Sequence, residues 1–314
     1  MDAFAVARLV AGAGFLAVAA TLDVRSRRVR DPLWIAMGTA GLALLAVELA
    51  WTGAVVNDWL LWGSAAILFY AVFYGKPILD EDRVHLRPLR ILILAAAVAG
   101  FLAALLLPTL ASTAGGTGGL APGMRLASMP IMVLVYQGFY QVGLLRGGAD
   151  AKAMIALTLL VPQYPDVAPF PLLGLQPNVL QAMEVFFPFS LIVLVNAAIL
   201  FLVVPIAYVL VNGIRGDLEF PQALFGTKAE IGALPKHVWL MERVDKHGER
   251  IAVLFPSRGK DESEEIAKLK AVGATRVWVQ PKVPFLVPLF VGFLLSAFVG
   301  NLMLGFLTAI LPHP

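Results

Sequence analysis

The sequence predicts an α-helical polytopic membrane protein with six to eight transmembrane helices and a small α/β cytoplasmic domain inserted before the last helix. Its 314 residues are 59% apolar and only 14% charged, and the mean hydropathy is +0.82. Soluble globular domains are about 45–50% apolar and about 25% charged, so the composition excludes an ordinary soluble fold. Long apolar runs fill most of the chain, and residues 212–283 form the one extended polar region.

A helix needs about 20 apolar residues to cross a bilayer core about 30 Å thick. Eight apolar segments are expected, at residues 3–22, 33–51, 58–74, 89–107, 129–146, 151–161, 186–211 and 284–311. The sixth is too short to cross alone, and the Pro-rich residues 162–177 are expected to be an external loop or a broken helix buried among its neighbours.

A cleaved signal peptide is an alternative for the first segment, because residues 17–19 match an A-x-A site. Asp2 and Arg8 argue against it, since that region should be basic and then uninterrupted apolar.

The positions of the 24 lysines and arginines predict the orientation. All except Arg8 and Arg125 lie after the first and third segments, between the fifth and sixth, or in the polar region before the last. Under the positive-inside rule these regions are cytoplasmic and both termini are external. Orientation in the lipid bilayer thus accounts for the basic residues, and no nucleic-acid partner is expected despite a pI near 9.2.

The chain is therefore expected to divide into a transmembrane catalytic domain (1–211), a small cytoplasmic α/β domain (212–283), and a last transmembrane helix with the C-terminus (284–314). In the polar region, the β-prone runs 238–241 and 251–255 flank a turn at 245–248 and predict a hairpin. Residues 262–271 predict a charged helix that Gly273 ends, and residues 276–279 predict another strand. This order indicates a ββαβ domain of marginal size, expected to lean on the membrane domain.

Carboxylates are the expected source of any chemistry at membrane depth. The chain has no cysteine, and its four histidines lie outside the apolar segments. Asp23 ends the first segment, and Asp150 opens the sixth, so the predicted topology places both at the cytoplasmic face. Asp31, Asp80, Glu81 and Asp82 are expected at the same face. Gly147 and Gly148, just before Asp150, allow close approach of an extended substrate.

Two segments resemble known motifs. Residues Leu22–Asp31 resemble the first aspartate motif of the archaeal class III signal peptidases, the preflagellin and prepilin peptidases. Residues Gly147–Lys152 are similar to their second motif, of the GxGD type, and residues 281–301 resemble the C-terminal region of the larger archaeal members. Ala149 departs from the family, which usually has glycine directly before the second aspartate, and alanine restricts positive φ.

The resemblance implies a membrane aspartic endopeptidase. Asp23 and Asp150 would activate water and remove the short signal peptide from precursor archaellins or pilins at the cytoplasmic face, without a metal or an organic cofactor. Two close carboxylates cannot both ionise easily, so one would act as base and the other as acid, in an order that the sequence leaves open. Lys152 is expected to favour an ionised Asp150. Asp80, Glu81 and Asp82 are expected to attract the basic residues that such precursors carry.

Two non-catalytic alternatives remain at this point. A transporter would place polar residues deep in the spans, where Asn196 is the clearest candidate. A membrane anchor would carry residues 212–283 as a regulatory module. The sequence does not distinguish among candidate precursors or among oligomeric states.

Overall fold

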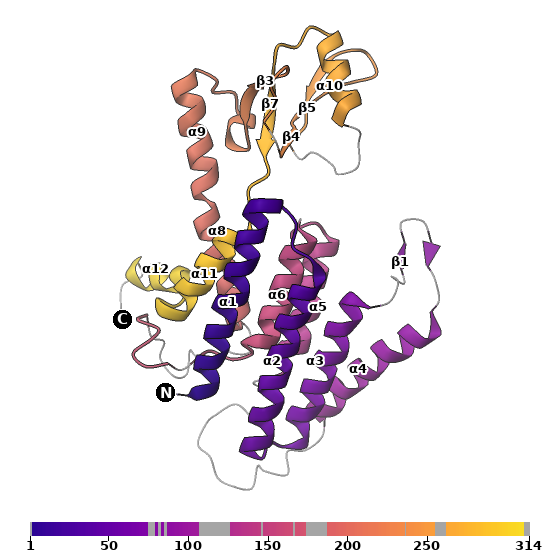
Figure 1. The fold of residues 1–314 in the computed structure, drawn as a ribbon, viewed down its shortest axis with the longest axis vertical. Coiled ribbons are helices and arrows are strands. Elements are labelled where there is room, and N and C mark those ends of the chain that lie inside the picture. The colour runs from indigo at the N-terminus through magenta and orange to yellow at the C-terminus, as the bar shows by residue number, and fades with distance from the viewer. Residues whose placement is uncertain are drawn as a thin grey trace. The chain divides into compact units, whose positions relative to one another are not determined.

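The protein forms two compact units in a computed structural model (Figure 1). One unit comprises Met1–Ala198 and Phe285–Pro314, and the other comprises Ile199–Pro284. The structure describes residues 2–74, 79–80, 83–84, 87–106, 126–145, 147–165, 167–173, 187–235, 237–254 and 262–310.

The first unit is helical. Its helices are α1 (Ala3–Ser26), α2 (Asp31–Thr52), α3 (Val56–Phe73), α4 (Pro88–Leu106), α5 (Ser128–Gln141), α6 (Gly148–Leu160), α8 (Phe189–Phe201), α11 (Leu286–Phe298) and α12 (Leu302–Ile310). Two short strands, β1 (Leu79–Asp80) and β2 (Arg83–Val84), pair antiparallel between α3 and α4. The first four predicted segments coincide with α1 to α4 within a few residues.

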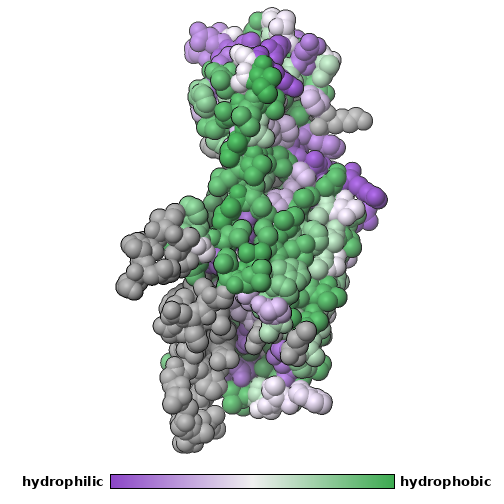
Figure 2. Space-filling model, turned by 90° about the vertical axis from the view of Figure 1, so that its left-hand side faces the viewer, coloured by the Kyte–Doolittle hydropathy of each residue, from purple (hydrophilic) through white to green (hydrophobic). Residues whose placement is uncertain are grey.

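Several of these helices make the chain a multi-pass membrane protein. Five helical stretches of the described chain are long and apolar enough to cross a bilayer: α1, α2, α3, α4 and Phe189–Arg215, which joins α8 to α9 (Val203–Arg215). Leu106 is 79% exposed and Leu92 is 66% exposed, and hydrophobic residues cover much of the visible surface of the helices (Figure 2). Soluble monomers rarely expose such large apolar surfaces, whereas a bilayer would cover them.

Helix α6 is the most buried helix of this unit. Apart from Lys152, every residue from Ala151 to Val161 is buried. A helix that is apolar on all sides can be buried completely among other helices, and α6 packs against α2, α5, α1 and α3. Backbone contact is closest at Gly41 of α2, where an added Cβ would lie 2.5 Å from the Leu160 Cα atom. The short sixth segment is therefore the centre of the bundle.

The last apolar segment, expected as one helix, is divided into α11 and α12. Gly300 has a φ of +107°, which ends α11, and its carbonyl accepts a 2.9 Å hydrogen bond from Asn196. Asn196 also donates to Ser296 and accepts from the Leu302 backbone N–H. One buried side chain thus provides partners for the Gly300 carbonyl and the Leu302 N–H at the break. Asn196 therefore has a structural explanation that needs no transported ligand.

The second unit carries the β-structure. After α9 come a 3₁₀ turn (Gln222–Leu224), β3 (Thr227–Glu230), β4 (Val238–Leu240), β5 (Glu242–Val244), β6 (Arg250–Ala252), α10 (Glu262–Ala271) and β7 (Arg276–Pro281). Strand β7 is the middle of an antiparallel sheet ordered β3-β7-β4, and β5 pairs with β6. Leu269 of α10 packs with Val277 and Val279 in a small core.

The strands differ in part from the predicted ββαβ pattern. The turn at 245–248 and the helix at 262–271 are present, but the hairpin around that turn is β5–β6. The run at 238–241 begins with β4, which pairs with β7. Strand β3 was not predicted, because Thr227–Glu230 lacks the apolar alternation of a typical strand.

Candidate active site

Asp23 lies in the last turn of α1, on the same face as residues that are buried in the preceding turns. Gly12, Leu16 and Ala19 are buried and share that face, because they repeat at the spacing of helical turns. Asp23 itself is half-buried. Its Oδ2 atom accepts a 3.3 Å hydrogen bond from the backbone N–H of Leu286, the first residue of α11. Partial positive charge at a helix N-terminus favours a carboxylate there.

Arg27 ends α1 directly beside this carboxylate. Its backbone has a φ of +52°, and its N–H donates to the Asp23 carbonyl at 3.0 Å. Only a few per cent of residues other than glycine adopt such a left-handed conformation. The turn reverses the chain immediately after Asp23 and leads into α2.

Asp150 lies in the first turn of α6, and Gly147 makes room for its carboxylate. The Asp150 N–H donates to the Gly147 carbonyl at 3.0 Å. A Cβ atom added to Gly147 would lie 2.1 Å from Asp150 Oδ2, a severe overlap. Gly148 is less restricted, since its added Cβ would find Tyr140 at 3.6 Å. Ala149 is helical, so the family departure at this position requires no positive φ.

The packing of α1 on α6 brings the two aspartates to one level. An added Cβ at Gly12 would contact the Leu160 side chain at 3.5 Å. Asp23 lies eleven residues after Gly12 in α1, and Asp150 lies ten residues before Leu160 in α6. At 1.5 Å per residue both steps are about 15–17 Å. Because α1 and α6 start at opposite ends of the bundle, both steps lead to the same end.

The helix directions are fixed by two ion pairs. Arg8, near the start of α1, pairs with Glu48, near the end of α2, at 2.5 Å. Lys152, in the first turns of α6, pairs with Asp31, the first residue of α2, at 2.6 Å. Helix α1 is therefore antiparallel to α2, and α2 and α6 begin at the same end.

Lys152 has a partner that its sequence position does not suggest, and its expected effect on Asp150 stays a prediction. Its ammonium contacts Asp31 and lies 5.4 Å from the centre of the Phe73 ring. Asp31, which pairs with Lys152, and the Leu286 N–H, which donates to Asp23, are thus two groups that the sequence did not identify. Asp31 was recognisable only as one of several acids at the same face, and a backbone donor leaves no signal in a sequence.

The acidic run at residues 80–82 is mostly outside the described residues. The structure describes the backbone of Asp80 in β1, while Glu81 and Asp82 lie outside the described residues. Their predicted role therefore stays a prediction.

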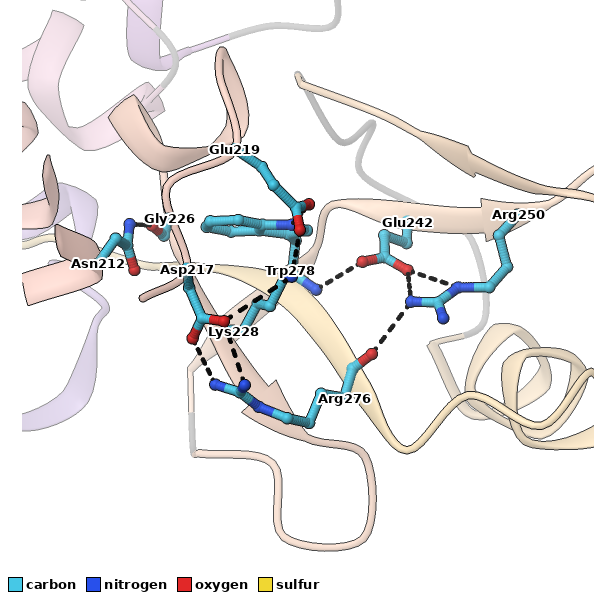
Figure 3. A network of polar contacts seen from close by, with 9 residues as sticks. All are labelled: Asn212, Asp217, Glu219, Gly226, Lys228, Glu242, Arg250, Arg276 and Trp278. Carbon is cyan, nitrogen blue, oxygen red and sulfur yellow. Dashed lines mark hydrogen bonds and ion pairs between the residues drawn. The ribbon is translucent and has the colours of Figure 1, made fainter. Parts of the chain in front are cut away.

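Polar side chains of the second unit form a network of hydrogen bonds and ion pairs with one another (Figure 3). Arg276 holds Asp217 with two hydrogen bonds, at 3.1 and 2.5 Å. Glu242 accepts from the Trp278 backbone N–H at 2.9 Å and pairs with Arg250. Each acid drawn has a cation or an N–H group as partner, which is the arrangement of a structural network.

Glu219 belongs to the same network. Lys228 donates to it at 2.5 Å and the Trp278 indole at 3.1 Å, and these hydrogen bonds lower the pKa of Glu219 below its usual value. A carboxyl held ionised in this way does not serve as a proton donor near neutral pH. The candidate chemistry therefore stays with the carboxylates of the helical unit.

Known proteins match parts of the chain. Residues 219–302 match a family described as Archaeal Peptidase A24 C-terminus Type II, and this range extends from Glu219 through β7 and α11. A protein named preflagellin peptidase from Methanocaldococcus jannaschii is 29% identical in an alignment of 180 residues that covers 55% of this chain and 71% of that protein. Another preflagellin peptidase, from Methanococcus voltae, is 30% identical in an alignment of 165 residues that covers 51% of this chain and 66% of that protein.

Proposed function

Because this chain belongs to the archaeal class III signal peptidases, a family of aspartic peptidases, we propose that it removes the signal peptides of precursor archaellins or pilins. Asp23 and Asp150 are the catalytic residues of this proposal. The observation that supports it most is that the packing of α1 on α6 carries both half-buried aspartates to one end of the bundle.

The chemistry of the proposed pair follows from electrostatics. Two carboxylates at short range disfavour double ionisation, so one proton is shared between them. The ionised member takes a proton from water as the water attacks the scissile carbonyl, and the protonated member donates a hydrogen bond to the carbonyl oxygen. The two aspartates titrate as a unit. The N–H of Leu286 orients Asp23, and Gly147 leaves space for the Asp150 carboxylate.

We further propose that cleavage takes place at the cytoplasmic face. The arginines that follow Asp23 in the chain, Arg25, Arg27, Arg28 and Arg30, support this orientation through the positive-inside rule. Asp80, Glu81 and Asp82 are then on the side from which a basic precursor would arrive.

Processing of a precursor by membranes that contain the full chain tests the proposal. Asp23→Asn and Asp150→Asn should each lower the cleavage rate by about 10²-fold or more, the contribution expected of general acid–base groups. Asp58→Asn is the matched control, because Asp58 is also in the first turns of a helix, α3, but at the end of the bundle where α2 finishes. Normal cleavage by either of the first two variants, shown by N-terminal sequencing of the product, would refute the assignment.

A further inference from the structure

The ion pair between Lys152 and Asp31 determines where a cation lies next to the proposed catalytic pair. Lys152 is two residues beyond Asp150 on α6, and its side chain is 27% exposed. Its ammonium is 2.6 Å from Asp31 Oδ1 and lies over the Phe73 ring of α3. Both contacts draw the charge toward α2 and α3.

The other charged and titratable groups at this end do not replace Asp31 as the partner of Lys152. Arg90 of α4 donates to the carbonyls of Ala71 and Tyr74, at 3.0 and 3.3 Å. The remaining described groups on the neighbouring elements are Asp23 and Arg25 of α1, Arg27, Arg28 and Arg30 of the turn that follows it, Tyr70 and Tyr74 at the end of α3, Arg87 before α4, and Tyr140 of α5. Asp31 is the acid whose contact with Lys152 the structure records.

We propose that Asp31 is a positioning residue for the reaction proposed above, because it pairs with the Lys152 ammonium, two residues beyond Asp150, and compensates its charge. A carboxylate pair works with one proton, and an uncompensated cation beside it favours the state with none. With Asp31 as its partner, Lys152 can link α2 to α6 without driving the second proton off the pair. This inference rests on the proposed function only for its catalytic readout.

A positioning role and a purely structural role of this ion pair predict different shifts in the pH at which the aspartate pair is protonated. Asp31→Asn would free the Lys152 cation and should move the protonation of the aspartate pair to lower pH. Lys152→Met would leave the Asp31 anion uncompensated and should move it to higher pH. The double variant loses both charges and should return close to the starting position. A structural pair would lower stability in both single variants without opposite shifts.

The experiment measures protonation directly as well as activity. A hydrophobic carbodiimide modifies protonated carboxyl groups, so labelling of Asp23 and Asp150, followed by mass spectrometry across a pH series, reports their protonation even without cleavage. The rate of precursor cleavage is measured on the same samples. The full chain in membranes is used as the wild type, as the two single variants, as the double variant, and as Asp58→Asn, the control at the opposite end of the bundle.

Asp31→Asn should shift the labelling midpoint and the pH–rate profile down by about 0.5–1 pH unit, and Lys152→Met should shift both up by a similar amount. The labelling midpoints of the double variant and of Asp58→Asn should lie within the error of the wild-type midpoint. Shifts in the same direction, no shift in either single variant, or a double variant that stays displaced would overturn the proposal. Labelling shifts of the expected signs in a chain that cleaves no precursor would support the role of Asp31 and refute the proposed function, so the two failures are distinguishable.

Discussion

At the scale of single residues, the position of the Asp150 carboxylate depends on Gly147 having no side chain. Its Oδ2 atom occupies the space where a Cβ of residue 147 would be, at 2.1 Å. The sequence predicts that Gly147 and Gly148 allow close approach of an extended substrate. The structure gives Gly147 a second reason, which is the position of the carboxylate itself.

Gly147→Ala should therefore displace Asp150 and lower kcat for precursor cleavage, by up to about 10²-fold, since a displacement of about 1 Å can have that effect. Gly138→Ala is the control, because Gly138 lies within α5 and an added Cβ there meets nothing within 4 Å. Steady-state cleavage assays compare the two. Equal rates for Gly147→Ala and the wild type would show that the carboxylate does not need this space.

At the scale of helices, the level of the two aspartates depends on close packing of α2 and α1 around α6. Gly41 permits the contact of α2 with α6, since an added Cβ would approach backbone atoms of Leu160 at 2.5 Å. Backbone atoms cannot move aside as a flexible side chain can, so the whole helix would have to shift. The ion pairs Arg8–Glu48 and Lys152–Asp31 then hold the helices at their two ends.

Gly41→Ala should lower both the melting temperature in detergent and the cleavage rate, because overpacking typically costs about 1–3 kcal/mol. Gly14→Ala of α1 is the matched control: nothing lies within 4 Å of its added Cβ. Alanine is the better helix former by about 1 kcal/mol, so this control should keep or raise the melting temperature. A Gly41→Ala protein as stable and active as Gly14→Ala would contradict the packing account.

The acidic run Asp80, Glu81 and Asp82 belongs to the segment between α3 and α4. If it attracts basic precursors, changing all three residues to Asn or Gln should raise KM, leave kcat nearly unchanged, and weaken the salt dependence of cleavage. The reason is that attraction between exposed charges is screened beyond about 8–10 Å at ordinary ionic strength. Replacing Glu264, an exposed acid of α10, by Gln provides a charge-neutralising control. An unchanged KM at both low and high salt would exclude the capture role.

At the scale of the whole molecule, the sequence predicted what composition and periodicity determine. The membrane class, the four N-terminal helices and the helix at 262–271 follow from long apolar runs or local helix signals. The break at Gly300 was missed because α11 and α12 are both apolar and the Asn196 contact that stabilises the break comes from a distant part of the chain. The pairing of β4 with β7 also depends on long-range contacts.

The candidate site also has a part that the sequence predicts and a part that depends on long-range contacts. Motif resemblance and expected topology predict Asp23 and Asp150 as the pair, and the helix packing brings both to one end of the bundle. The partner of Lys152 could not be chosen from sequence, because Asp31 was one of several acids expected at that face. The backbone N–H that Asp23 accepts could not be identified either.

The central claim is that Asp23 and Asp150, far apart in sequence, form one site. The chain has no cysteine, so paired cysteine substitutions can test this in the otherwise unchanged protein. Asp23→Cys combined with Asp150→Cys is treated with a short thiol cross-linker in membranes, and linked peptides are identified by mass spectrometry. Asp31→Cys with Lys152→Cys is the positive control, since those side chains are in contact. Asp23→Cys with Asp58→Cys is the negative control, because α2 has 22 residues and spans about 33 Å between the two ends.

The account predicts a cross-link between positions 23 and 150 with a yield close to that of the positive control, and none between positions 23 and 58. A protein that links positions 31 and 152 but leaves positions 23 and 150 unlinked would contradict it, because the two aspartates would then be too far apart to share a proton and a substrate.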